Sequence, residues 1–466
     1  MSGSLSDYIF VRRIQQSLLS KIIMNARETF RHSLLLAGAL FITAPAHAAE
    51  PAESVDTRIV RLEQELADLK SQVQLQSSAA TLPEQAKKTG TQSPLSVTLG
   101  SGTKVQLYGF ARFDASWENS RITPGNIALY VSPKGSNGND AEWNLTGNAT
   151  RIGMNLSGPD TANMKLSGNI ELDFLTSVNT ENNGAPRLRH GYLKAFWPAS
   201  DISIIAGQTW DVQSALIPFV DDPAILWDAG NIGSRHPQLR LTKGFKTGEK
   251  SRIELAIAAA RAIGEQKTIG PDKIDTGKDA PMPTIEGRLA LNTPIFVHNQ
   301  PATLAVSGHY GKEEWDLDAK GNNVVVDSWS CNAELSMPLG ETLLFAGEYF
   351  TGSNLDDFLG GIGQGVNSTT NASAPKSIRA HGGWAAVRYA VCPSTNISLG
   401  GGIDEPNSED LWQNARALNR TFFAAVTKKI TPNFIVGMQI SDWKTEYLQT
   451  ENSHAVRAQT SMTYTF

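Results

Sequence analysis

The C-terminal residues of this chain alternate between two kinds of side chain. Residues of one parity are mainly apolar: Val456, Ala458, Thr460, Met462, Tyr464 and Phe466. Residues of the other parity are polar: Arg457, Gln459, Ser461, Thr463 and Thr465. Successive side chains of a β-strand point to opposite faces of the sheet. A strand with one apolar and one polar face, ending on an aromatic residue, is typical of a closed sheet whose outer wall contacts lipid.

The same alternation recurs along residues 104–466, where short links and longer polar loops take turns between the apolar stretches. Counting the stretches predicts an all-β transmembrane barrel of about 16 antiparallel strands. The least regular stretches are 187–197 and 419–429. A soluble β-sandwich also alternates apolar and polar residues. The length without a domain break, the charged residues at inward mid-strand positions and the terminal aromatic residue argue against it.

Residues 1–48 have the features of a secretory signal preceded by an upstream extension. Arg27 and Arg31 come before an apolar run from Leu34 to Ile42, and small residues surround Ala48. This order is typical of a signal peptide, which we expect to be cleaved after Ala48. Cleavage would remove five basic and two acidic residues, changing the net charge from −5 to −8. No basic surface for nucleic acid is indicated.

Residues 49–76 carry a short heptad pattern. Its apolar positions are separated by four and three residues in turn: Val55, Ile59, Leu62, Leu66, Leu69 and Val73. Such spacing predicts an α-helical coiled-coil segment, which we place in the periplasm. An amphipathic helix on the barrel mouth is the alternative. Residues 77–103, rich in Ser, Ala, Thr, Lys and Pro, are expected to form a linker.

The segment Asp211 to Arg235 is unusually apolar for a loop and also contains Asp221, Asp222 and Asp228. Exposed loops rarely carry so much apolar surface. We therefore expect this segment to lie against the inner wall and narrow the lumen, with these three acids in a constriction. The alternative is an extracellular loop buried in an oligomer interface.

Seven basic residues fall on the lumen face by strand parity: Arg112, Arg151, Arg240, Arg288, Arg388, Arg457 and Lys165. The guanidinium fork suits carboxylates and phosphates, so these residues would favour small anions, including dicarboxylates, in a pore. The alternative is that they pair with lumenal acids and stiffen the wall: Asp114, Glu171, Asp173, Glu286, Glu334 and Glu348.

No enzyme motif is apparent. The histidines lie outside any recognisable nucleophile motif, and the sequence singles out no metal-ligand cluster, phosphate-binding loop or required cofactor. Cys331 and Cys392 are the two cysteines, and we expect both thiols to be free. The chain is therefore predicted not to be an enzyme.

Several short motifs, taken in order, resemble the DcaP-like family of trimeric outer-membrane porins. They are the signal, the heptads from Val55 to Val73, Leu107-Tyr108-Gly109-Phe110, Gly207-Gln208-Thr209-Trp210, Pro237-Gln238-Leu239-Arg240 and terminal Phe466. The resemblance covers roughly residues 55–466. It implies a sixteen-stranded barrel, a homotrimer with periplasmic N-terminal helices, diffusion of small anionic solutes such as dicarboxylates, and recognition of Phe466 by the barrel-assembly machinery.

We therefore expect a porin in the lipid of a Gram-negative outer membrane, through which small hydrophilic solutes diffuse with a preference for small anions. The alternative is a non-conducting tether or adhesin that uses a periplasmic coiled coil. A planar bilayer distinguishes the two, because a tether carries no current.

Overall fold

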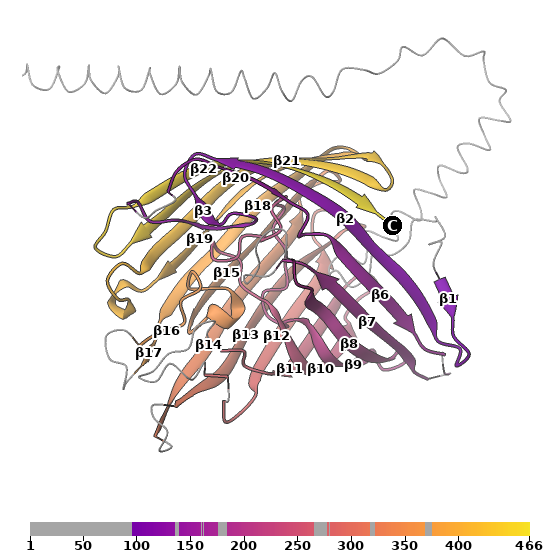
Figure 1. Ribbon diagram of the computed structural model, residues 1–466. Helices are drawn as coiled ribbons and strands as arrows, with labels where there is room; N and C mark the ends of the chain where they lie inside the picture. The colour runs from indigo at the N-terminus through magenta and orange to yellow at the C-terminus, as the bar shows by residue number, and fades with distance from the viewer. Residues whose placement is uncertain are drawn as a thin grey trace, which may run out of the picture. The chain divides into compact units, whose positions relative to one another are not determined.

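The chain folds into a closed antiparallel β-barrel (Figure 1). The computed structural model describes residues 96–135, 139–159, 161, 163–175, 184–264, 277–278, 280–316, 322–368 and 375–466. The signal expected at 1–48 and the coiled coil expected at 49–76 lie outside these residues. Within the expected linker, 77–103, strand β1 (Ser96–Thr98) pairs with the start of β2.

The large sheet contains the following strands: β1, β2 (Lys104–Glu118), β5 (Glu142–Thr146), β6 (Arg151–Ser157), β7 (Lys165–Asp173), β8 (Arg187–Trp197), β9 (Ile202–Trp210), β10 (Arg235–Lys246), β11 (Arg252–Ala260), β12 (Thr284–Pro294), β13 (Pro301–Asp316), β14 (Asn323–Pro338), β15 (Leu343–Ser353), β18 (Arg379–Cys392), β19 (Thr395–Pro406), β20 (Arg416–Thr431), β21 (Phe434–Tyr447) and β22 (Ser453–Thr465). Both irregular stretches, 187–197 and 419–429, are strands.

The barrel has sixteen strands around its wall, as the sequence predicted. The first, β2, pairs with the last, β22, for example Asp114 with Ser461, and this closes the sheet. On its other side β2 pairs with both β5 and β6, which form one interrupted strand. At the interruption the Thr150 hydroxyl accepts the Arg112 N–H at 3.1 Å and donates to the Arg112 carbonyl at 3.3 Å. A side chain thus replaces the missing ladder bonds.

The two faces of the wall differ as the alternation predicts. Outward positions carry exposed apolar side chains, such as Leu239 at 59% and Val306 at 57%, whereas inward positions such as Glu286 are buried at 0%. Outward aromatic residues gather near the short-turn rim: Phe245, Phe296, Tyr389 and Tyr464. Others stand nearer the long-loop rim: Trp143, Tyr310, Trp329, Tyr349 and Phe422. Two such girdles are typical of transmembrane barrels.

Short turns gather at one rim and longer loops at the other. The turn between β18 and β19 is residues 393–394, whereas the connection between β15 and β18 spans 354–378. The described parts of the longer loops contain two small sheets, β3 (Ile122–Pro124) with β4 (Ala128–Val131) and β16 (Val366–Asn367) with β17 (Lys376–Ser377). They also hold two 3₁₀ turns, η1 (Asp356–Phe358) and η2 (Ser408–Asp410).

Terminal Phe466 lies at the short-turn rim, where its backbone N–H donates to the Gly109 carbonyl at 3.0 Å. Both cysteines are free and exposed, as the sequence predicted. Among the described residues, no helix has the length and apolar character needed to cross a membrane.

Candidate pore and its lining

The loop between β9 and β10, residues 211–234, folds into the barrel. Its backbone N–H groups donate to three inward side chains: Val212 to Glu286 at 2.6 Å, Leu216 to Glu348 at 2.8 Å and Asp221 to Gln439 at 2.7 Å. These acceptors stand on β12, β15 and β21. The loop, called here the inner loop, therefore runs along the inner wall of one half of the barrel.

Apolar contacts hold the middle of the inner loop to the wall. Leu226, exposed at 3%, packs against small and aromatic side chains of β15, β18 and β20: Ala346, Trp384, Ala386, Phe423 and Ala425. Leu216, Phe219 and Val220 pack beside this cluster. Burial of apolar surface favours the folded position by about 25 cal/mol per Å². This packing explains the apolar composition that set the segment apart in the sequence.

Glycines on β18 and β19 and in the inner loop allow the loop backbone to approach the wall closely. A Cβ at Gly402 would lie 2.1 Å from the Ala229 carbonyl oxygen, and one at Gly230 would lie 2.2 Å from the Gly383 carbonyl oxygen. Gly230 also has a φ of +116°, which L side chains rarely adopt. The loop backbone therefore rests directly on strand backbone.

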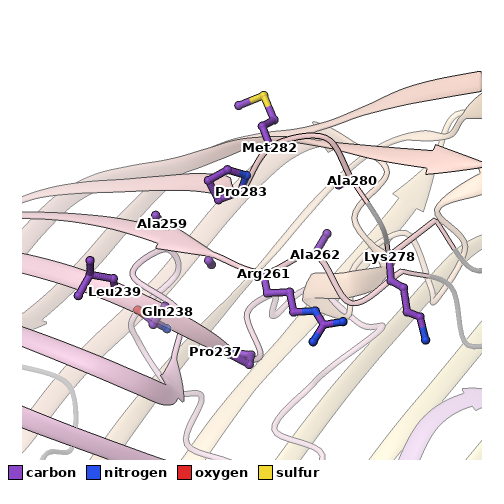
Figure 2. Close-up of a pocket in the computed structure, with 11 residues that line it drawn as sticks. Pro237, Gln238, Leu239, Ala259, Arg261, Ala262, Lys278, Ala280, Met282 and Pro283 are labelled. Carbon is purple, nitrogen blue, oxygen red and sulfur yellow. The ribbon is translucent and has the colours of Figure 1, made fainter.

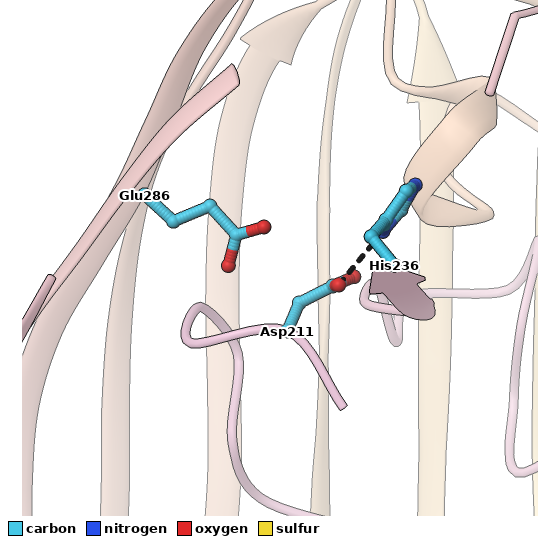
Figure 3. Close-up of side chains that lie close together, drawn as sticks. All are labelled: Asp211, His236 and Glu286. Atoms are coloured by element: carbon cyan, nitrogen blue, oxygen red, sulfur yellow. Dashed lines mark hydrogen bonds and ion pairs between the residues drawn. The ribbon is translucent and has the colours of Figure 1, made fainter. Parts of the chain in front are cut away.

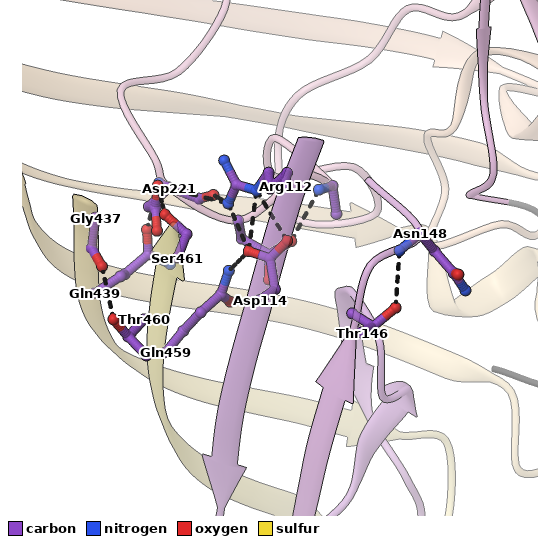
Figure 4. A network of polar contacts seen from close by, with 12 residues as sticks. Arg112, Asp114, Thr146, Asn148, Asp221, Gly437, Gln439, Gln459, Thr460 and Ser461 are labelled. Carbon is purple, nitrogen blue, oxygen red and sulfur yellow. Dashed lines mark hydrogen bonds and ion pairs between the residues drawn. The ribbon is translucent and has the colours of Figure 1, made fainter. Parts of the chain in front are cut away.

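Asp221 fastens the inner loop to the seam between β2 and β22 (Figure 4). Its carboxylate accepts the Ser461 hydroxyl at 3.0 Å and lies 3.6 Å from the Arg112 guanidinium, which also donates to the Asp221 carbonyl at 2.6 Å. The carboxylate occupies the space above Gly437, where a Cβ would lie 2.4 Å from it. Burial raises the pKa of Asp221, and Arg112 opposes this.

The other two acids of the inner loop are also buried. Asp222 accepts the Ala224 N–H at 2.8 Å and lies 3.7 Å from Arg457, and burial raises its pKa. Burial raises the pKa of Asp228 to about 7. Because the exposed fractions of Asp221, Asp222 and Asp228 are 8%, 4% and 4%, these acids anchor the loop and contribute little surface to the open lumen.

Three of the arginines expected in the lumen are paired with carboxylates. Arg112 contacts Asp114 at 2.7 Å, Arg288 contacts Glu334 at 2.7 Å and Arg457 contacts Glu118 at 2.6 Å. A paired charge contributes little net field. The contacts of these three arginines match the alternative given in the sequence analysis, in which lumenal arginines pair with acids and stiffen the wall. Glu286 and Glu348, expected as arginine partners, instead accept hydrogen bonds from the inner loop.

The other four basic residues are placed differently. Arg151 lies 3.5 Å from Glu171 and keeps 29% of its side chain exposed. Arg240 is buried and donates to Gln238 at 2.9 Å and to the Trp210 carbonyl. Arg388 is exposed, and its guanidinium lies 4.6 Å from the centre of the Phe219 ring of the inner loop. Lys165 is exposed at the short-turn end of β7.

Three further lumenal arginines were not predicted from strand parity: Arg187, Arg189 and Arg235. A bulge in β8 between the partners of Glu171 and Leu172 breaks the parity on which the assignment relied. Arg189 bridges Glu171 and Asp173 at 2.7 Å each.

Arg235, by contrast, lies over an aromatic ring at the end of the inner loop. Its guanidinium stands 3.6 Å from the centre of the Trp210 ring and 5.8 Å from that of Trp227. The described residues place no carboxylate within 4.0 Å of it. Stacking on tryptophan is a favourable setting for a guanidinium.

The half of the barrel that the inner loop leaves open contains a cavity of about 360 Å³. Its lining comes from β2 and β6 to β10 and from the chain end: Gln106, Tyr108, Gly109, Phe110, Arg151, Asn155, Asn169, Glu171, His190, Tyr192, Ile205, Thr209, Trp210, Arg240, Thr465 and Phe466. The lining mixes apolar and aromatic surface with polar side chains, among which are two arginines and one glutamate. It can therefore accommodate small hydrophilic solutes, with cationic side chains beside them.

A second cavity, of about 450 Å³, lies away from the lumen (Figure 2). Leu239 and Ala259 line it from outward positions near the long-loop ends of β10 and β11, together with Arg261, Lys278 and Met282. Because its floor belongs to the outer wall, this cavity is not part of the pore.

Comparison with known proteins gives one family match and several similar folds. The model of the DcaP outer membrane protein family matches residues 41–221. The outer membrane channel DcaP of Acinetobacter baumannii superposes with a TM-score of 0.64 at 17% identity, covering 79% of this chain and 99% of that one. No curated protein sequence matches.

Two other solved structures share the fold at lower identity. An anion-selective porin from Comamonas acidovorans superposes with a TM-score of 0.51 at 10% identity, covering 78% of this chain and all of that one. OmpF of Salmonella typhi does so with a TM-score of 0.50 at 12% identity, covering 80% and 100%. The family match supports an outer-membrane location, and these neighbours support a barrel of the porin type. The resemblance of this chain to the DcaP outer membrane protein family, expected from its sequence, is thereby confirmed.

Proposed function

We propose that this chain forms a passive pore of the outer membrane that passes small hydrophilic solutes and favours small anions such as dicarboxylates. The observation that carries the proposal is an excess of arginine beside the lumenal cavity. Among the described residues, Arg151, Arg187, Arg189 and Arg235 have two neighbouring carboxylates, Glu171 and Asp173. Uncompensated positive charge in a narrow aqueous passage lowers the barrier for anions and raises it for cations.

The position of the inner loop supports the same proposal. It covers the wall from β12 to β22, which holds the tightly paired Arg288 and Arg457, and leaves the arginine-rich wall open. Arg388 adds an exposed cation without a carboxylate within 4.0 Å among the described residues. The related channel from Acinetobacter and the anion-selective porin from Comamonas share this fold.

Reversal potentials in a KCl gradient across a planar bilayer test the anion preference. We expect native protein to favour Cl⁻, and Arg388→Gln and Arg187→Gln each to reduce the Cl⁻/K⁺ permeability ratio by at least about twofold, since a charge about 8 Å from an ion in water contributes about 0.5 kcal/mol. The matched control is the double substitution Arg288→Gln with Glu334→Gln, which removes a 2.7 Å ion pair without changing the net charge.

Three outcomes would count against the proposal in different ways. Equal permeability ratios in all four proteins would remove the arginine explanation. A cation-preferring native pore would remove the anion preference. A native protein that carries no current in the bilayer would favour the tether or adhesin.

The proposal extends to how the chain assembles in the membrane. We propose a non-enzymatic homotrimer, surrounded by outer-membrane lipid, with residues 49–76 in the periplasm. The exposed aromatic terminus, Phe466, at the short-turn rim supports recognition by the barrel-assembly machinery. Native mass spectrometry of protein extracted in detergent tests the trimer.

A further inference from the structure

Three side chains form a buried cluster at the root of the inner loop (Figure 3). Asp211 is the first residue of the loop, His236 is the second residue of β10, and Glu286 stands on β12. Their exposed fractions are 2%, 1% and 0%. One potential ligand atom from each residue lies within 4.8 Å of the other two. Residues 25 to 75 positions apart in the sequence thus converge on one point.

Backbone amides orient both carboxylates of this cluster. Asp211 accepts the Ser234 N–H through Oδ2 at 2.7 Å, and Glu286 accepts the Val212 N–H through Oε2 at 2.6 Å. The second oxygen of Asp211, Oδ1, lies 2.7 Å from His236 Nδ1. Each carboxylate therefore keeps one oxygen in a fixed position that its backbone bond does not use.

The second oxygen of Glu286 points to a missing partner. Oε1 is buried and has no hydrogen-bond partner in the part of the chain that the structure describes, and the residue is fully shielded from solvent. Figure 3 shows the side chain extending from the wall toward Asp211. The Arg240 guanidinium acts on both carboxylates from nearby, but it makes no hydrogen bond to this oxygen among the described residues. A buried polar atom without a partner is costly, so the oxygen points to a ligand that the protein atoms do not supply.

We infer that Asp211, His236 and Glu286 bind a divalent transition-metal ion, with Zn²⁺ as the best match. Zinc accepts one imidazole nitrogen at about 2.0–2.1 Å and carboxylate oxygens at about 2.0–2.2 Å. Calcium takes oxygen ligands alone and does not suit the imidazole. The ion takes the place of the proton between Asp211 and His236, and this proton is released to solvent.

The position of the cluster gives the ion a structural role. It joins the start of the inner loop, through Asp211, to β10 and β12 of the wall, through His236 and Glu286. A bound ion stabilises the folded state in proportion to its occupancy. Zinc therefore fixes the root of the loop in place, and this role is independent of which solutes the pore passes.

Zinc binding to the full chain, purified from outer membranes in detergent and stripped with chelator, tests this inference. We expect isothermal titration with ZnCl₂ to show one site per chain and CaCl₂ to show none. His236→Gln and Glu286→Gln should each weaken zinc binding by more than about tenfold. The control, His298→Gln, makes the same change at an exposed histidine of the turn between β12 and β13.

Anomalous diffraction at the zinc edge locates the ion directly in native protein, so the test does not depend on the variants folding. A peak between the three side chains is the expected result. Absence of zinc binding by native protein would overturn the inference, as would equal affinity in native protein and His236→Gln, or a peak elsewhere with none at the cluster.

Discussion

At the scale of single residues, burial separates two kinds of charge inside the barrel. Arg288 and Arg457 pair closely with Glu334 and Glu118 and are nearly inaccessible, so they stabilise the wall. Arg388 is exposed and stacks on a ring of the inner loop, so it remains available to a passing solute. The sequence assigns all three arginines to the lumen, but only the contacts decide which of them a solute meets.

We expect Asp228 to make the stability of the barrel depend on pH. Burial raises its pKa to about 7, although Arg416 opposes the shift. A raised pKa favours the protonated folded state, so the contribution of this group is complete below about pH 4 and is lost as pH rises through 7. We expect Asp228→Asn to melt close to native protein at pH 4 and to be more stable by up to about 4 kcal/mol at pH 8.

The matched comparison is Asp410→Asn, for which the opposite sign is expected. Burial acts to raise the pKa of Asp410, but hydrogen bonds from Arg379 and Lys376 hold it at about 2. Its contribution is present above about pH 4, so Asp410→Asn should melt below native protein at pH 8. Thermal denaturation from pH 4 to 8 measures both variants. A flat difference between native protein and Asp228→Asn across this range would contradict the assignment.

At the scale of elements, the inner loop is the part that occupies one half of the barrel interior. Glycines on the wall allow close backbone contact, the side-chain oxygens of Glu286 and Gln439 accept backbone N–H groups of the loop, and Asp221 holds it at the seam between β2 and β22. We expect Gly437→Ala to displace Asp221, because the new methyl group would lie 2.4 Å from that carboxylate. The displaced loop should raise single-channel conductance and current noise.

The control for this substitution is Gly287→Ala on β12, where a Cβ would meet nothing within 4 Å. Its conductance should equal that of native protein. If Gly437→Ala conducts like Gly287→Ala while both form barrels, then Asp221 does not restrain the inner loop.

The strands could be predicted from the sequence because each strand that crosses the membrane faces lipid on one side and water on the other. Its side chains therefore alternate between apolar and polar. The position of the inner loop against the wall could be predicted because its many apolar residues would otherwise be exposed to water. Its anchors could not, since Glu286, Glu348 and Gln439 become neighbours of the loop only when the barrel closes. Arg187 and Arg189 were missed because the bulge in β8 shifts the parity within one strand.

At the scale of the whole molecule, the described part of the chain is a wall between two solvents. The outer face carries exposed apolar side chains and aromatic girdles, and the inner face carries buried polar networks. The inner loop divides the interior into a filled half and a half with a cavity of about 360 Å³ beside an arginine-rich wall. This asymmetry is what the proposed anion preference rests on.

Swelling of liposomes that contain the native protein tests this account most directly. Iso-osmotic solutions of a small dicarboxylate and of a diamine of similar length are compared with protein-free liposomes. The account predicts that the protein admits both solutes and that the dicarboxylate causes the faster swelling, because the uncompensated arginines favour anions. Swelling no faster than in protein-free liposomes, or faster swelling with the diamine, would contradict it.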